Sequence, residues 1–119
     1  MLNARARNIV TSSEPDQTLA FLVEVAAGSG LSDAKSITNA AERRTAIRAF
    51  YSQMKAPVIN VLHTYSKDGI EVVNNLDGTL QFIAAGPAEA WEKAILEHKE
   101  LFDSPAVSLI PNDAVAFVY

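Results

Sequence analysis

Hydrophobic and polar positions alternate most clearly between residues 18 and 27 of the chain. In an extended backbone Phe21, Val23 and Val25 would lie on one strongly apolar face. β-Branched and aromatic side chains favour strands, and the Gly-Ser-Gly sequence that follows is a typical end for one. We therefore predict a strand here. A helix that begins after a cap at Ser13 is the alternative, because the apolar residues also fit helical spacing.

Residues 38–55 show the clearest helical spacing. Asn39 can cap the start, and Glu42 stands three residues later, as in a capping box. One apolar stripe follows, made of Ile47, Phe50, Tyr51 and Met54. Proline has no N–H donor and restricts the residue before it, so we expect the helix to stop before Pro57.

The second half of the chain predicts short strands around one more helix. Strands are expected at residues 58–65, 70–73 and 79–84, and Asp-Gly sequences between them indicate tight turns. A helix that begins with a proline is expected over 87–102, followed by a strand at 106–110.

The order of these elements is β, α, β, β, α, β, with one extra hairpin strand. It predicts an α+β fold of the split βαβ (ferredoxin-like) type, an antiparallel sheet with both helices on one face. We expect a flexible N-terminal lead-in over residues 1–17, an α+β domain over 18–113 and an extended C-terminal tail over 114–119.

Composition excludes several classes of protein. Hydrophobic residues make up 49% and charged residues 20%, as in ordinary globular domains. There is no cysteine, so disulfides and thiolate zinc sites are excluded. The longest apolar run is far short of the ~20 residues that cross a bilayer, so no membrane association is expected. The net charge of −4 argues against nucleic acid as a partner. Arg43, Arg44 and Arg48 form the only dense basic cluster, interpreted as a solvated helix face rather than a phosphate site.

Side chains that could carry catalysis are few. No carboxylate or second histidine stands at ligand or triad spacing from His63 or His98, so we expect neither a metal nor an active site there. No phosphate-binding loop or nucleophile elbow is present, and we predict no cofactor and no enzyme activity. A small enzyme or ligand-binding domain of the same fold stays open, with His63 or Tyr65 as the polar group that points inward.

The last six residues, 114–119, are apolar, aromatic and uncharged. Most chain ends are polar. One interpretation is a final strand that completes the sheet. The other is a protruding extended peptide, which offers its backbone and alternate side chains to the groove of another protein.

The segment 105–119 resembles the C-terminal end of subtilisin propeptides. The shared pattern is proline, any residue, valine, two residues, an aliphatic, two residues, aspartate, any residue and valine-alanine, with a tyrosine at the end. Upstream, residues 21–25, 61–65 and 80–85 resemble the family's first three strands, and the helix around Trp91 resembles its second helix.

This resemblance implies a mechanism of protease inhibition. The propeptides pack their sheet on the protease and lay the tail in the substrate cleft like a cleaved product. Carried over here, Tyr119 would fill the primary specificity pocket, with its carboxylate by the catalytic serine. Val118, Phe117 and Ala116 would occupy the preceding subsites. Asp113 would face helix N-termini of the protease, where a carboxylate accepts hydrogen bonds from unpaired backbone N–H groups.

We therefore predict a proteinaceous inhibitor of subtilisin-type serine proteases, monomeric when free. No signal peptide is evident, so we expect a stand-alone cytoplasmic inhibitor, with an excised propeptide and a secreted protein left open. The alternative is a non-enzymatic protein-interaction or dimerisation module of ferredoxin-like fold.

Overall fold

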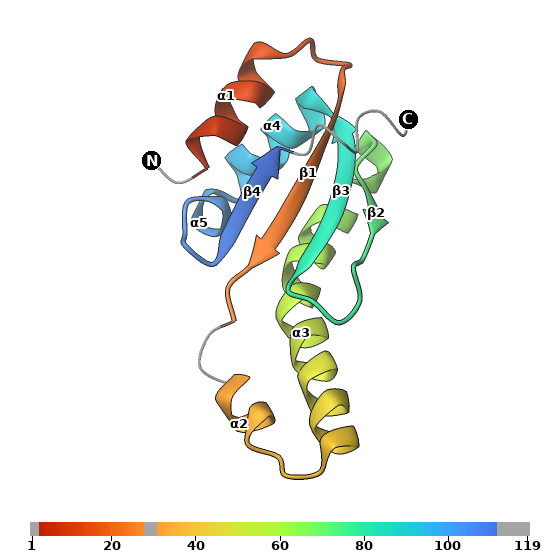
Figure 1. Cartoon of the computed structure of the whole chain (residues 1–119). Coiled ribbons are helices and arrows are strands. Elements are labelled where there is room, and N and C mark those ends of the chain that lie inside the picture. The colour runs from red at the N-terminus through yellow and green to blue at the C-terminus, as the bar shows by residue number, and fades with distance from the viewer. Residues whose placement is uncertain (1–2, 28–30, 112–119) are drawn as a thin grey trace.

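The computed structural model describes residues 3–27 and 31–111. It is an α+β fold in which a four-stranded antiparallel sheet, ordered β2-β3-β1-β4, packs against helices (Figure 1). The predicted α+β class and antiparallel sheet are confirmed. The helices and strands, in chain order, are α1 (Ala4–Ser12), β1 (Thr18–Val25), α2 (Leu31–Lys35), α3 (Ala40–His63), β2 (Glu71–Asn74), β3 (Gln81–Pro87), α4 (Ala88–Glu97), α5 (Lys99–Phe102) and β4 (Val107–Pro111).

β1 lies in the middle of the sheet and pairs with β3 on one side and β4 on the other. In this register Leu22 faces Ile83 across one ladder and Ile110 across the other. Alternate residues of β1 such as Phe21 are buried, whereas Glu24 is exposed. The predicted strand is confirmed over the helical alternative, because a period of two buries its apolar side chains on one face.

The core lies between the sheet and the helices and is built around aromatic side chains. Trp91 of α4 meets Phe21 of β1 edge to face, with ring centroids 4.9 Å apart. The indole N–H of Trp91 donates to the backbone carbonyl of Leu19 at 3.1 Å, which satisfies the polar atom of a fully buried side chain. Phe82 and Phe102 are fully buried in the same cluster.

α3 continues to His63, so the strand predicted for residues 58–65 is wrong. Val58 and Leu62 are one helical turn apart and fully buried in the core cluster. Tyr65, just beyond the helix, is buried with them. These residues follow one another at spacings of four and three, as on one face of a helix. Their burial against the core favours a helix here, although β-branched residues favour a strand.

Pro57 lies inside α3, although a proline was expected to end the helix. Its missing N–H leaves the carbonyl of Gln53 without the usual partner. Both residues are exposed, so water can bond that carbonyl. The proline therefore lies on the exposed side of α3, where the loss of a backbone hydrogen bond destabilises the helix least.

The flexible lead-in predicted over 1–17 is wrong for most of its described part, which forms α1. Ala6 and Val10, four residues apart, are buried against the core. The side chain of Asn3 ties the start of α1 to three backbone groups, the carbonyls of Phe102 at 2.8 Å and Val107 at 3.2 Å and the N–H of Leu109 at 2.8 Å. The segment is therefore part of the folded domain and supports β4.

The turn between β2 and β3 is held by a buried lysine from α3. The Lys55 ammonium donates to the carbonyls of Asn75 at 2.8 Å and Gln81 at 3.2 Å. Burial lowers the pKa of Lys55, and the nearby charge of Asp77 opposes that effect. Gly78 adopts a φ of 83°, which suits the Asp-Gly turn predicted there.

The helix predicted over 87–102 is divided in two. α4 ends before His98, whose φ of −123° and ψ of 48° are not helical, and α5 follows it. Pro87 is the N-cap of α4, one residue before the position predicted. Within the described residues no helix has the length and apolar character needed to cross a membrane.

Candidate functional site

The predicted site residues Asp113, Ala116, Phe117, Val118 and Tyr119 lie outside the residues that the structure describes. The structure gives the surface from which this segment departs. β4 is an edge strand, and its last residue, Pro111, pairs with Phe21 of the central strand. Residues 112–119 therefore follow directly from one edge of the sheet.

One face of the sheet packs on the helices, and the other, here called the open sheet face, carries no described helix (Figure 1). It is formed by the residues that alternate with the core positions. Its members are Ala20, Leu22 and Glu24 of β1, Glu71 and Asn74 of β2, Gln81, Ile83 and Ala85 of β3, and Ser108 and Ile110 of β4. Val73, at a bulge of β2, lines the same face beside Glu71 and Ala85.

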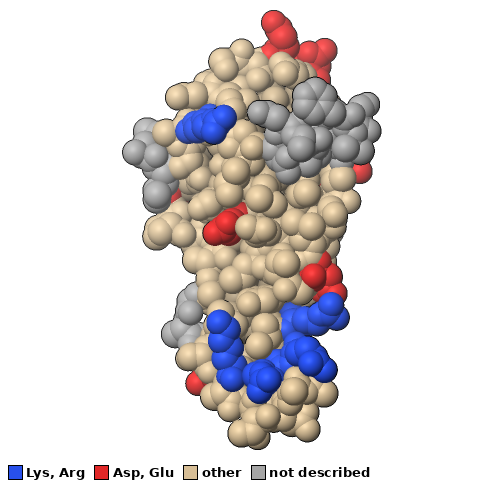
Figure 2. Space-filling model, viewed as in Figure 1, with Lys and Arg blue, Asp and Glu red and all other residues tan. Residues whose placement is uncertain are grey.

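The centre of the open sheet face is apolar. Leu22 lies between Ile83 and Ile110, and these side chains come from three adjacent strands. Ile110 and Val73 are each 41% exposed, and both belong to the small set of large apolar side chains exposed among the described residues. In Figure 2 the part of this side that is not covered by grey atoms is largely uncharged. An apolar surface of this kind is typical of a protein contact.

Polar groups lie toward the ends of the same face. The amide of Gln81 donates to the carboxylate of Glu24 at 3.0 Å, across the β1–β3 ladder. Near the β2 edge the face sinks into a hollow of about 270 Å³. Its walls are Thr18, Gly69, Glu71, Val73, Ala85, Gly86 and Pro87. The face thus combines an apolar centre, a carboxylate and a hollow that a partner's side chain can enter.

The polar side chains singled out for chemistry, His63, His98 and Tyr65, lie in different surroundings. His63 is exposed at the end of α3, whereas the ring of His98 packs edge-on against Tyr65 with centroids 5.9 Å apart. The Tyr65 hydroxyl donates to Glu97 at 2.5 Å, and burial followed by this bond raises the pKa of Tyr65 to about 12. This bond joins the segment just after α3 to α4. No three His, Asp or Glu side chains of the described residues are placed to hold a metal ion.

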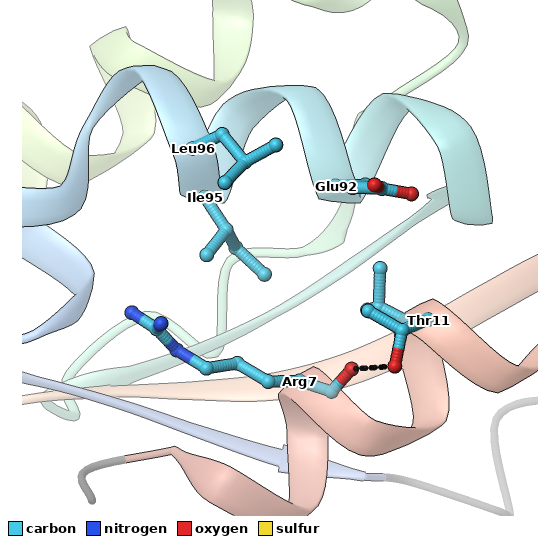
Figure 3. Close-up of a pocket in the computed structure, with 6 residues that line it drawn as sticks. Arg7, Thr11, Glu92, Ile95 and Leu96 are labelled. Atoms are coloured by element: carbon cyan, nitrogen blue, oxygen red, sulfur yellow. Dashed lines mark hydrogen bonds between the residues drawn. The ribbon is translucent and has the colours of Figure 1, made fainter.

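A second hollow, of about 110 Å³, lies between α1 and α4 (Figure 3). Its lining comes from both helices, namely Arg7, Val10, Thr11, Glu92, Ile95 and Leu96. The guanidinium of Arg7 forms an ion pair with Asp103, and Thr11 donates to the Arg7 carbonyl at 3.0 Å. Ligand pockets usually measure about 300–1,000 Å³, so this hollow is too small to be a ligand site.

Sequence reasoning did not assign residues to the open sheet face. The signal was present in the even-numbered positions of β1, where Leu22 interrupts an otherwise polar or small-residue face. A strand with apolar residues on both faces indicates either a second layer or a binding surface.

Comparisons of this chain with protein families, with curated proteins and with solved structures find no match. The structure therefore defines the protein by class, as an α+β domain with a four-stranded antiparallel sheet packed against helices.

Proposed function

We propose that this chain inhibits subtilisin-type serine proteases. The open sheet face would pack on the protease, and residues 112–119 would enter the substrate cleft. The observation that carries the proposal is the position of β4. β4 is an edge strand of the sheet, and its last residue, Pro111, comes directly before the proposed tail in the sequence, which supports the proposal.

The finer fold assignment belongs to the same proposal. β1, α3, β2, β3, α4 and β4 follow one another in the order of a split βαβ sandwich, with the sheet order 2-3-1-4. We propose that the domain is of this ferredoxin-like type, with α1 and α2 as additions. Subtilisin propeptides, which the C-terminal segment resembles, share this architecture.

In the proposed complex Tyr119 occupies the primary specificity pocket, and Val118, Phe117 and Ala116 fill the subsites before it. Asp113 accepts hydrogen bonds from N–H groups at helix ends of the protease. The sheet fixes where the tail starts, so less conformational entropy is lost on binding than for a free peptide. The chain acts as a bound product and needs no catalytic group of its own.

The first experiment titrates a subtilisin-type protease with the purified chain and follows hydrolysis of a peptide substrate. We expect stoichiometric inhibition that is lost when residues 117–119 are deleted, with an unchanged unfolding transition. The single substitution Tyr119→Gly should weaken inhibition by about 1–3 kcal/mol, the contribution of one apolar pocket. Equal inhibition by the truncated and full-length chains would show that the tail mechanism is wrong.

A second pair of variants tests the open sheet face. Ile110→Glu adds a charge to this face, whereas Leu96→Glu adds the same charge to α4, where Leu96 is 55% exposed. We expect the first variant to weaken inhibition about tenfold or more, because a buried unpaired carboxylate costs more than 1.4 kcal/mol. The Leu96 variant should inhibit like the wild type. Similar behaviour of the two variants would exclude this face from the contact.

The second candidate is a protein-interaction or dimerisation module that uses the same face. The exposure of Ile110 and Val73 supports it as well, because a second copy of the chain could cover them. The oligomeric state of the free chain separates the two proposals.

A further inference from the structure

A helical arm extends the molecule beyond the sheet. It consists of α2 and the N-terminal half of α3, residues 31–52 (Figure 1). The molecule measures 51 Å in its longest direction and 29 and 23 Å in the others. The apolar stripe of α3 is only half-buried within the arm, at Ile47, Phe50 and Tyr51. A projection of this kind adds surface without adding much to the core.

The arm is basic, although the whole chain is acidic. It contains four basic and two acidic residues, whereas the rest of the chain has six basic and twelve acidic residues. The four basic residues, here called the arm patch, are Lys35, Arg43, Arg44 and Arg48. Lys and Arg side chains gather over the arm on the side of the molecule that also carries the open sheet face (Figure 2).

The arm patch is not neutralised within the described residues. The ion pairs of the described residues are Arg7–Asp103 and Lys93–Asp68, and neither includes a residue of the arm patch. Arg43 donates to the backbone carbonyl of Ile37 at 3.1 Å, which orients its side chain without cancelling the charge. The guanidinium of Arg48 lies beside Gly78 in the turn between β2 and β3. Neither contact is an ion pair, so the charges of the arm patch remain available to a partner.

The positions of these arginines do not favour α3 itself. Asn39 is the N-cap of α3, so Arg43 and Arg44 lie close to the positive end of the helix dipole. Arg44 and Arg48 are four residues apart, where like charges destabilise a helix. Three arginines placed against local electrostatics, with no compensating carboxylate contact, indicate a role in binding.

We propose that the arm patch is a second contact of the protease interface and recognises an acidic surface on the protease beside its substrate cleft. This inference rests on the proposed function. The arm continues the open sheet face on the same side of the molecule (Figure 2), so a protease that covers this face can also reach the arm patch.

A protein fits this surface better than a polyanion. Nucleic acid or an anionic membrane would approach a chain with an overall charge of −4 and a neighbouring face that carries Glu24 and Glu71. An apolar patch with cations at one end instead matches a protein surface that has an apolar centre and an acidic region on one side.

The test compares two variants with the same change in net charge. Arg44→Glu with Arg48→Glu reverses two exposed charges of the arm patch. Lys67→Glu with Lys99→Glu reverses two exposed charges outside the arm. Each variant is mixed by stopped flow with two subtilisin-type proteases, one of acidic and one of basic isoelectric point. Association rate constants are measured at 20 mM and 500 mM salt, and thermal unfolding checks that each variant is folded.

We expect the arm variant to associate about tenfold more slowly with the acidic protease at low salt, and this difference should shrink at high salt. The association rate constant of the control variant should lie within about twofold of the value expected from its change in net charge alone. With the basic protease, the arm variant should associate no more slowly than the wild type.

Three results overturn the inference. Equal slowing by both variants would mean that only net charge acts, and an unchanged rate for the arm variant would exclude a contact there. Binding of the wild-type chain to duplex DNA at 150 mM salt, lost in the arm variant, would assign the arm patch to nucleic acid. If the wild type inhibits neither protease, the proposed function itself fails, a result distinct from inhibition that the arm substitutions leave unchanged.

Discussion

The pair formed by Tyr65 and Glu97 links the segment just after α3 to α4 through one hydrogen bond of 2.5 Å. Burial raises the pKa of Tyr65 to about 12, and the hydrogen bond and charge of Glu97 act in the same direction. An unfolded tyrosine titrates near 10. The folded state therefore holds this proton more tightly, so its stabilising contribution is complete below pH 10 and is lost as the pH rises to about 12.

The variant Tyr65→Phe tests this contribution. At pH 8 it should lower the free energy of unfolding by about 1 kcal/mol, because the hydrogen bond is lost and Glu97 loses its donor. The difference from the wild type should shrink between pH 10 and 12, because the tyrosine of the unfolded wild type ionises there while the folded state must keep its proton. Urea unfolding at pH 8, 10 and 11.5 measures it. Tyr51→Phe on α3 is the control, since its hydroxyl bonds to no described residue. A difference that stays constant with pH would contradict the assignment.

At the scale of elements, sequence patterns identify those whose periodicity is consistent along their whole length. β1 follows a period of two and was predicted correctly, because tertiary burial agrees with local propensity. α3 was predicted from Asn39 but ended too early. The apolar residues Val58 and Leu62 have helical spacing, yet a proline and β-branched residues argued locally for a strand. Burial against the sheet, which a local pattern does not contain, decided the outcome.

Contacts between distant parts of the chain, which a local pattern does not contain, also explain why α1 and the candidate site were not predicted. Ala6 and Val10 have the spacing of a helix face, but only their contacts with α4 and β4 make α1 part of the core. The open sheet face required the register of three strands, which places Leu22 between Ile83 and Ile110. Local alternation predicts which residues share a strand face, whereas strand neighbours depend on the whole fold.

The proline within α3 provides a test at this scale. Pro57→Ala restores an N–H donor to the carbonyl of Gln53 and removes the clash of the ring with the preceding turn. We expect the free energy of unfolding to rise by about 1–3 kcal/mol, since both residues are exposed and no core packing changes. Urea unfolding measures the change. Ser52→Ala, also exposed in α3, should add no more than about 0.5 kcal/mol. A Pro57 variant no more stable than the wild type would mean that α3 accommodates the ring without cost.

At the scale of the molecule, helices cover one face of the sheet, and the open sheet face is moderately apolar. It leaves Ile110 and Val73 partly exposed, and it also carries Glu24 and Glu71. The arm adds positive charge at one end of an elongated body. If the open sheet face binds a protein, as proposed, this surface favours a partner that differs from the chain, because two copies that meet face to face would bring their like charges together.

We therefore expect the free chain to be a monomer of 12.8 kDa at about 100 μM. A twofold contact through the open sheet face buries only a few hundred Å² from each copy, whereas stable dimers need about 800 Å² or more, so the apolar gain does not offset the loss of translational freedom. Size-exclusion chromatography with light scattering measures the mass. A dimer of twice this mass would favour the interaction-module proposal, and Ile110→Glu, but not Leu96→Glu, should then return it to the monomer. A dimer that resists Ile110→Glu would place the contact elsewhere and leave the open sheet face available to a protease.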